Sequence, residues 1–338
     1  MFLRNLVCAT ALTLCCMMGI TQAQEGKLGH AMPQEHPQAG SMDKFIELVG
    51  QYTDGRVKLK AFPGGVLGGD DKMMQSAQTG TLEVFYGAVQ PVSGRVKEYQ
   101  IFDFPFLFNT MKEVDYVFYG PLGEKLNKLM EPLNLIPLGW GEAGFRHLSN
   151  SRRAIKSVND LNGLKIRVMQ NTVALETWKA MGANAVPMSY AEVFTALENK
   201  TLDGQENPLI HMYANKMQEV QKYITLTGHV YTPCVLAVNS KFWEKIKPED
   251  QAAMRKAAAE AFKFHRKSMT AADADVIAKL EQGGVKVEPL PPEELAKIRG
   301  LVKPVIDKFI PVVGEEFAKE FFAEIEKARN GASRPGAE

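Results

Sequence analysis

The stretch Gly163-Leu164-Lys165-Ile166-Arg167-Val168, followed by Asp203-Gly204-Gln205-Glu206-Asn207-Pro208, decides how the rest of the chain is interpreted. An earlier arginine, Arg146, stands in Gly144-Phe145-Arg146-His147. Each arginine lies among apolar residues in a segment typical of a strand, where an unpaired guanidinium would be costly to desolvate. An anionic partner is therefore expected, and the planar fork of arginine suits a carboxylate. The partner is either a bound carboxylate ligand or an internal Glu or Asp, and residue type alone favours the internal salt bridge.

The N-terminus is typical of an exported protein. Arg4 supplies one positive charge ahead of an apolar run at 6–20, and Thr21-Gln22-Ala23 then precedes the polar Gln24. This pattern predicts a secretory signal peptide over residues 1–23 that is cleaved after Ala23. The apolar run is short for a membrane span, and no later segment is long enough for one.

Cysteine usage and charge narrow the class of protein. Three of the four cysteines would leave with the signal peptide, and Cys234 remains without a partner for an internal disulfide. Its apolar surroundings indicate an inert strand residue. The formal net charge is +1, with 40 basic and 39 acidic residues and no polybasic run. This balance argues against nucleic acid or an anionic membrane as a partner.

Strand-like and helix-like segments alternate along the chain, which predicts an α/β fold with largely parallel strands. Apolar spacing and turn residues predict strands at 27–32, 56–62, 81–87, 164–169, 184–188, 202–205, 223–226 and 229–238. They predict helices at 41–52, from Asp70, from 171 or 172 to 181, behind a capping box at Ser189 to Glu192, from Pro248 to Gly283, and as a final pair from Pro292. The segment at 229–238 is long enough to run between two domains, and the long helix after Pro248 would brace them.

No pattern in the chain predicts catalysis, a metal site or a cofactor. The sequence has no Gly-x-Ser-x-Gly, Cys-x-x-Cys or His-Glu-x-x-His motif, and its six histidines lack metal-ligand spacing. The glycine-rich turn at 63–69 lacks the Lys-Ser/Thr pair of a phosphate loop. Asp70 and Asp71 follow it at a helix start, where acidic residues are favoured, and this position suffices to explain them.

Four segments of the sequence, taken together, resemble the TRAP-transporter solute-binding proteins of the DctP type. They are Gly-Phe-Arg-His at 144–147, Gly-Leu-Lys-Ile-Arg-Val at 163–168, Pro187-Met188-Ser189 before Glu192-Val193, and Asp-Gly-Gln-Glu-Asn-Pro at 203–208. The resemblance covers nearly the whole chain after the signal peptide. It implies a periplasmic binding protein-like fold with two α/β domains joined by crossover strands and a long spanning helix. We expect one domain at 24–143 with 232–271, a second at 144–231 with 272–328, and a flexible tail at 329–338.

The resemblance also implies roles for individual residues. Arg167 matches the principal carboxylate-binding arginine of the family, Arg146 a second ligand-facing arginine, Asn207 a ligand-facing asparagine, and Tyr190 the aromatic residue that stacks on the ligand. Polar specificity contacts are predicted for Gln90, Glu142, His211 and the loop at 34–36 with His36. Export, the absence of catalytic motifs and the run at 203–208 together favour a ligand clamp over internal salt bridges.

The predicted function is that of the solute-binding component of a TRAP transporter, not an enzyme. A monomer would close over a small organic acid and then dock on the membrane permease. The ligand is predicted to be a sugar acid (a uronate or an aldonate) or a C4-dicarboxylate, and Glu142 in the pocket would favour a hydroxyl-rich acid. Two alternatives remain at this stage: a secreted enzyme acting on a small carboxylic acid, and a sensor partner with the same fold.

Overall fold

The structure, a computed structural model, describes residues 23–332. The predicted signal peptide, up to residue 22, and residues 333–338 of the predicted tail lie outside the described residues. Within 23–332, nine strands form one sheet in the order β2-β1-β3-β8-β4-β7-β5-β6, with β9 paired to β8. The strands are β1 (Gln24–Gly29), β2 (Val57–Phe62), β3 (Val84–Ala88), β4 (Leu135–Asn150), β5 (Lys165–Val168), β6 (Asn184–Pro187), β7 (Gly204–Asn207), β8 (Tyr223–Asn239) and β9 (Lys286–Pro289).

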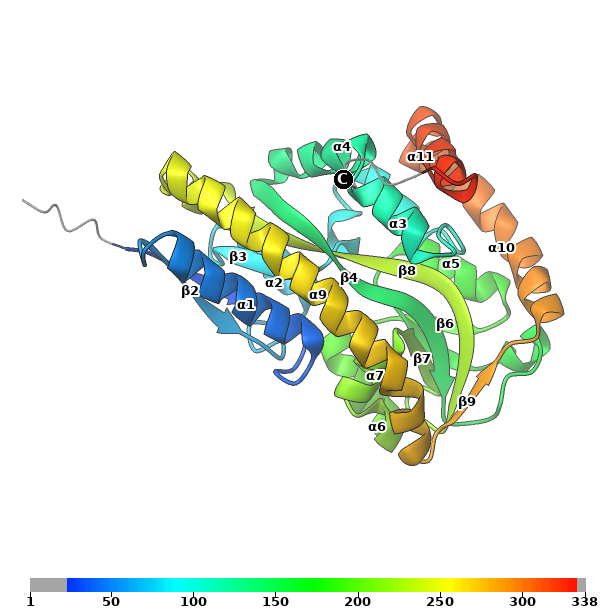
Figure 1. The fold of residues 1–338 in the computed structure, drawn as a ribbon. Helices are drawn as coiled ribbons and strands as arrows, with labels where there is room; N and C mark the ends of the chain where they lie inside the picture. The colour runs from blue at the N-terminus through cyan, green and yellow to red at the C-terminus, as the bar shows by residue number, and fades with distance from the viewer. Residues whose placement is uncertain (1–22, 333–338) are drawn as a thin grey trace, which may run out of the picture.

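The sheet has two halves that share two long antiparallel strands. Half I contains the parallel strands β1, β2 and β3, and half II contains the parallel strands β5, β6 and β7. β4 and β8 pair with each other through both halves, as the long central strands in Figure 1 show. The two strand segments predicted at 223–226 and 229–238 are thus one strand, β8. The mixed α/β fold with two domains is confirmed.

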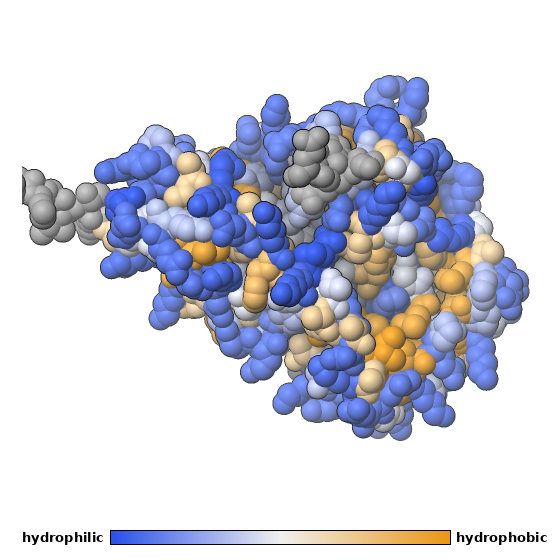
Figure 2. All heavy atoms as spheres, viewed as in Figure 1, coloured by the Kyte–Doolittle hydropathy of each residue, from blue (hydrophilic) through white to orange (hydrophobic). Residues whose placement is uncertain are grey.

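Helices cover both halves of the sheet. They are α1 (Pro37–Tyr52), α2 (Asp70–Thr79), α3 (Met111–Phe118), α4 (Pro121–Met130), α5 (Thr172–Ala180), α6 (Val193–Glu198), α7 (Leu209–Ala214), α8 (Ser240–Trp243), α9 (Pro248–Gln282), α10 (Pro292–Val313) and α11 (Glu315–Arg329). On the face drawn in Figure 2 most of the surface is hydrophilic, with apolar residues gathered at the lower right. In the part of the chain that the structure describes, none of these helices combines the length and the apolar character that a membrane crossing requires.

The long helix α9 connects the two halves. At 35 residues it is about 52 Å long at 1.5 Å per residue. Its first part buries Met254, Ala257 and Phe262 in the core of half I beside α1, and its last part buries Val276 and Leu280 in half II beside α6 and α7. Figure 1 shows it running diagonally across the molecule. Alanines at the crossing let the helix lie close to α1 and β4.

The C-terminal helices return to half I. After β9, α10 contacts α5 in half II, and α11 then packs on α3. Phe317 and Phe321 of α11 share a hydrophobic core with Phe102 and Phe118 of half I. The sequence analysis grouped this segment with the second domain, and its exact domain boundaries stay a prediction.

One local prediction, the capping box at Ser189, is wrong. Residues Tyr190–Glu192 form a single 3₁₀ turn, and the Ser189 side chain makes no capping hydrogen bond to it. The Ser189 hydroxyl instead lies 3.5 Å from Oδ1 of Asp71, at the start of α2 in half I. A contact with the other half therefore takes the place of the local cap, because a serine at a helix start can bond wherever an acceptor is close.

Candidate functional site

A cavity of about 120 Å³ lies between the two halves. Several of its lining residues lie within four residues of the ends of parallel strands: Met32 after β1, Gln90 after β3, Met169 after β5, and His211 after β7. Ligands of open α/β sheets bind at this edge. By the volume that one buried water requires, the cavity has room for roughly eight to twelve water molecules, or a small organic molecule.

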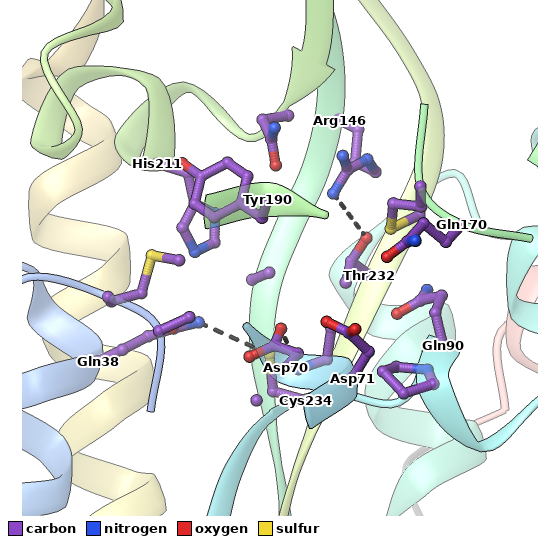
Figure 3. Close-up of a pocket in the computed structure, with 18 of the residues that line it drawn as sticks. Gln38, Asp70, Asp71, Gln90, Arg146, Gln170, Tyr190, His211, Thr232 and Cys234 are labelled. Carbon is purple, nitrogen blue, oxygen red and sulfur yellow. Dashed lines mark hydrogen bonds between the residues drawn. The ribbon is translucent and has the colours of Figure 1, made fainter. Parts of the chain in front are cut away.

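Arg146 reaches the cavity because β4 changes register just before it. The register of β4 against β8 shifts between Glu142 and Gly144, where Gly144 has a φ of 115°, a conformation that only glycine adopts easily. The guanidinium then forms a buried ion pair with Glu206 on β7 through both Nε and Nη2, the latter 2.8 Å from Oε1. Its Nη1 donates to the Thr232 hydroxyl at 3.3 Å (Figure 3). The internal salt bridge that residue type favoured is therefore present at Arg146.

The carboxylate of Glu206 stays ionised in this buried position. Burial alone would raise its pKa, but Arg146 and His229 outweigh burial and hold the pKa at about 2. His229 contributes a hydrogen bond of 3.1 Å from its Nε2 to Glu206 Oε2. Arg146 and Glu206 thus form a neutral pair, with the cavity on one side of it.

Arg167 differs from Arg146 because it has no carboxylate partner. Its Nε and Nη2 donate to the carbonyl of Met188 at 2.9 and 2.7 Å, and its guanidinium lies 5.7 Å from the centre of the Tyr190 ring. Among the described residues Nη1 has no acceptor. Burial, followed by repulsion from Arg146, lowers the pKa of Arg167 to about 10, so the side chain keeps its charge at neutral pH. This guanidinium is a buried positive charge beside the cavity.

Six of the eight predicted site residues line the cavity. Arg146, Arg167, Asn207, Tyr190 and His211 come from half II or from the end of β4 next to it, and Gln90 comes from half I. The Asn207 side-chain amide donates to Gln205, which leaves one N–H and its oxygen for other partners. Figure 3 shows Arg146, Tyr190 and His211 on one side of the cavity and Gln38, Asp70 and Asp71 on the other.

The other two predicted residues, Glu142 and His36, lie behind the cavity wall. The Glu142 carboxylate faces Arg266 of α9, whose Nε lies 3.2 Å from Oε1. Burial, the largest effect, raises the pKa of Glu142 to about 7. His36 is the N-cap of α1, where its Nδ1 accepts from the backbone N–H of Gln38, and its ring stacks on His211 at 4.6 Å.

The polar residues that face the two arginines were not predicted from the sequence. Asp70 and Asp71 at the start of α2, and Gln38 on the first turn of α1, line the cavity from half I. The two acidic residues had been explained by their place at a helix start. Their position in the sequence could have indicated them, because residues that follow parallel strands gather at one edge of the sheet. No group of His, Cys, Asp and Glu within 23–332 is arranged to hold a metal ion.

The two walls of the cavity can bind an anion by non-covalent contacts alone. One wall carries a buried, unpaired positive charge and a second arginine that is already neutralised. The opposite wall carries carboxyl and amide groups that can accept or donate hydrogen bonds. A small acid with hydroxyl groups matches both walls.

Comparison with known proteins identifies the family of the chain. The model of the family "Bacterial extracellular solute-binding protein, family 7" (DctP) matches residues 28–311. The sugar acid binding protein of Advenella mimigardefordensis, solved in complex with galactonate, is 37% identical with a TM-score of 0.89, over 91% of this chain and 99% of that one. A TRAP periplasmic solute-binding protein of Sulfurospirillum deleyianum with bound succinate is 30% identical with a TM-score of 0.85, over 89% and 99% of the two chains.

A further relative carries the name of its ligand. The 2,3-diketo-L-gulonate-binding periplasmic protein of Escherichia coli is 33% identical over 265 residues, which are 78% of this chain and 81% of that protein. The family match spans most of the chain, and the solved relatives share its two-domain fold. The chain therefore belongs to the family 7 extracellular solute-binding proteins, the DctP family of periplasmic solute-binding proteins of TRAP transporters.

Proposed function

We propose that this protein captures a monocarboxylic sugar acid, an aldonate or a uronate, in the periplasm and delivers it to the membrane permease of a TRAP transporter. The observation that carries the proposal is the buried guanidinium of Arg167, which has no carboxylate partner. A buried charge without a counter-charge is costly, so the cavity favours a ligand that supplies one.

Arg167 is the principal clamp in this proposal, with Arg146 and Asn207 beside it. The ligand carboxylate accepts from Nη1 of Arg167, and the free N–H of Asn207 fixes its orientation. Charge-assisted hydrogen bonds of this kind are about twice as strong as neutral ones. Tyr190, already stacked near Arg167, covers the apolar face of the ligand.

The charges of the cavity favour one carboxylate over two. Arg146 is neutralised by Glu206, and burial, followed by repulsion from Arg146, lowers the pKa of His211 to about 3, so this ring is neutral. Arg167 is then the one uncompensated cation among the described residues that line the cavity. The opposite wall carries Asp70 and Asp71, whose oxygens can accept hydrogen bonds from hydroxyl groups. Burial raises the pKa of Asp70 to about 7, so it repels a second carboxylate only in its ionised state. A sugar acid fits this pattern better than succinate does.

Capture follows from closure of the two halves. In an open form both walls face water, and the ligand can contact both walls only in the closed form, so binding shifts the population toward closure. The register shift of β4 at Glu142 and Gly144 lies at the predicted domain boundary and is a candidate hinge. The permease would recognise the closed form. Cleavage after Ala23 would release the protein into the periplasm.

A thermal-shift screen tests the proposal. The panel contains aldonates, uronates, succinate and malate, and we expect the sugar acids to raise the melting temperature more than the dicarboxylates. Arg167→Ala should weaken binding by at least about 30-fold, because truncating one partner of a buried charge pair costs 2–5 kcal/mol. The matched control is Arg152→Ala, since Arg152 lies in half II but is 65% exposed.

Three outcomes would contradict the proposal. They are a stronger response to dicarboxylates, normal binding by Arg167→Ala in a folded protein, and conversion of the bound acid to a product. The last would favour an enzyme, and recovery of the unchanged acid from the complex excludes it.

A further inference from the structure

Gly69 lies at a point where the two halves of the molecule touch. It is the N-cap of α2 in half I, and it is buried. Ser189 reaches it from half II, two residues after the end of β6. A Cβ atom on Gly69 would lie 2.7 Å from the Ser189 hydroxyl oxygen, which is closer than non-bonded atoms of this kind approach. In the arrangement that the structure shows, half II therefore fills the place of a side chain at residue 69.

The backbone of Gly69 does not itself require glycine. Its φ of −71° and ψ of 174° are an extended conformation that any residue adopts. Gly68, the residue before it, has a φ of 111°, where glycine is needed for its conformation. At an N-cap, moreover, Ser, Thr, Asp and Asn stabilise a helix at least as well as glycine does. What glycine provides at residue 69 is space for Ser189.

The polar contacts that cross between the halves beside Gly69 are weak. The Ser189 hydroxyl lies 3.5 Å from Oδ1 of Asp71. Nδ2 of Asn215, which lines the same small groove as Gly69, lies 3.9 Å from the Met32 sulfur. Hydrogen bonds of ordinary strength are shorter than about 3.2 Å, and a thioether is a weak acceptor. These contacts supply little attraction, whereas overlap of Ser189 with residue 69 prevents a closer approach, so the touching point limits closure and does not drive it.

We propose that Gly69 and Ser189 form a closure stop, a contact that sets how far the two halves close over the bound acid. This inference rests on the proposed function and makes Gly69 a positioning residue, because Gly69 itself does not line the cavity. Asp70 follows Gly69 and Tyr190 follows Ser189, and these two neighbours lie on opposite sides of the cavity (Figure 3). The approach of Gly69 to Ser189 therefore fixes the width of the cavity. An acid that bridges the two walls binds well only when residue 69 lets them come this close.

The first test places a side chain between the halves. Gly69→Val keeps the extended backbone, and the valine should hold the halves apart and weaken the binding of D-galactonate or D-glucuronate by about tenfold or more, measured by calorimetry. Adding Ser189→Gly removes the side chain that the valine meets, so the double variant should regain part of the lost affinity. The matched control is Gly94→Val, since Gly94 is an exposed residue of half I whose Cβ would have nothing within 4 Å. Its affinity should equal that of the wild type.

The second test joins the two residues by a disulfide, in a variant that carries both Gly69→Cys and Ser189→Cys. The Ser189 oxygen lies one bond of about 1.4 Å from its own Cβ and 2.7 Å from the Cβ placed on residue 69, so the two Cβ atoms would be at most about 4.1 Å apart, inside the range of about 3.5–4.5 Å that disulfides need. We expect oxidation to link residues 69 and 189, as identified by peptide mapping. The probe acid should speed the reaction, because it favours the arrangement in which the two residues meet.

Four results would overturn the assignment. They are wild-type affinity in Gly69→Val, no recovery when Ser189→Gly is added, no disulfide between residues 69 and 189 with or without the acid, and a rate of disulfide formation that a bound acid leaves unchanged. The proposed function fails separately, if the wild type binds neither probe acid. The disulfide forms or fails to form without any ligand, so it still decides whether the halves meet at this contact, and the two failures can be told apart.

Discussion

At the scale of single residues, the buried ion pair of Arg146 and Glu206 combines a cost of desolvation with a strong mutual attraction. Both side chains are at most 3% exposed, and Glu206 also accepts from His229. Removing one partner of such a pair leaves an uncompensated buried charge. We therefore expect Glu206→Ala to lower the free energy of unfolding by about 3–5 kcal/mol, measured by denaturant titration.

The matched control is the exposed pair of Lys125 and Glu320. Their side chains are 48% and 46% exposed, so Glu320→Ala should cost about 0–1 kcal/mol. An equal loss in the two variants would mean that the buried pair contributes no more than a surface one. The Glu206 contribution should also persist in mild acid, because a pKa of about 2 places its loss at pH values from the unfolded pKa near 4.5 down to 2.

Sequence reasoning at this scale identified charged residues but not all of their partners. Arg146 and Arg167 were both predicted to need an anion. Arg146 has an internal carboxylate partner, whereas Arg167 has none among the described residues, so its role as a ligand clamp stays a prediction. Glu142 was expected in the pocket, yet it faces Arg266. Asp70 was dismissed, yet it lines the cavity. The orientation of these two acidic side chains depends on their neighbours in β3 and α9. Residue type alone does not predict that orientation.

At the scale of elements, a histidine stack joins helices of opposite halves. His36 caps α1 in half I, and its ring lies 4.6 Å from that of His211 on α7 in half II, at an angle of 15°. His36 Nε2 and His211 Nδ1 are buried without partners. Burial, His211, His265 and His30 hold the pKa of His36 well below its usual range, and burial with Arg146 does the same for His211. Both rings are therefore neutral in the arrangement that the structure shows.

This stack should make capture sensitive to acid. If opening separates α1 from α7, the two rings regain ordinary pKa values near 6.5 in the open form. The closed form is then favoured fully above pH 6.5 and loses this advantage as the pH falls, by up to about tenfold in affinity per pH unit for each histidine. We expect the dissociation constant of a sugar acid to rise between pH 6.5 and 5.

The test is His36→Asn, compared with the wild type over the same pH range. Asparagine keeps a good N-cap for α1, and His36 does not line the cavity, so the variant removes one titrating ring with little other change. Its affinity should fall less steeply with acid, by about one proton. Identical slopes for the two proteins would show that the stack does not report on closure.

The order of elements was largely predictable, because it depends on local patterns. The helix from Pro248 to Gln282 and the opening of α5 at Asn171 follow from apolar spacing and capping residues, and the structure has both. The failed capping box at Ser189 involves a contact with Asp71, which is 118 residues away. Contacts between the two halves join residues that are far apart in the sequence, so no local pattern predicts them. The helices and strands were therefore easier to predict than the cleft between the halves.

At the scale of the whole molecule, the strands β4 and β8, the helix α9 and the C-terminal helices α10 and α11 connect the two halves. β4 and β8 cross the centre of the sheet, and α9 spans its face (Figure 1). His265, near the middle of α9, bonds Ser41 of α1 at 3.0 Å and the Glu142 carbonyl at 3.1 Å. The helix, α1 and the register shift of β4 therefore meet at one point behind the cavity. We propose rotation about this point as the movement that opens the cavity.

Cys234 offers a direct measure of that opening. It is the one cysteine among the described residues, it is buried, and it lines the cavity between Gln38 and Tyr86. In the chain without residues 1–23, a thiol reagent can reach it only when the halves separate. The labelling rate should therefore follow the open fraction and fall by a factor of about 1 + [L]/Kd on addition of a bound sugar acid, which is roughly 100-fold at 100 times the dissociation constant. The measurement is the rate of thiol modification with and without the acid.

Two comparisons separate closure from simple stabilisation. Arg167→Ala should label at the unprotected rate whether the acid is present or absent, because it lacks the clamp that links the two walls. A dicarboxylate that binds weakly should protect only in proportion to its own affinity. A labelling rate that saturating acid leaves unchanged would mean that Cys234 is reached through a path other than the cleft, and closure over the ligand would then lose its support. If the acid protects Cys234 from labelling in the wild type but not in Arg167→Ala, closure of the two halves depends on the charge of Arg167.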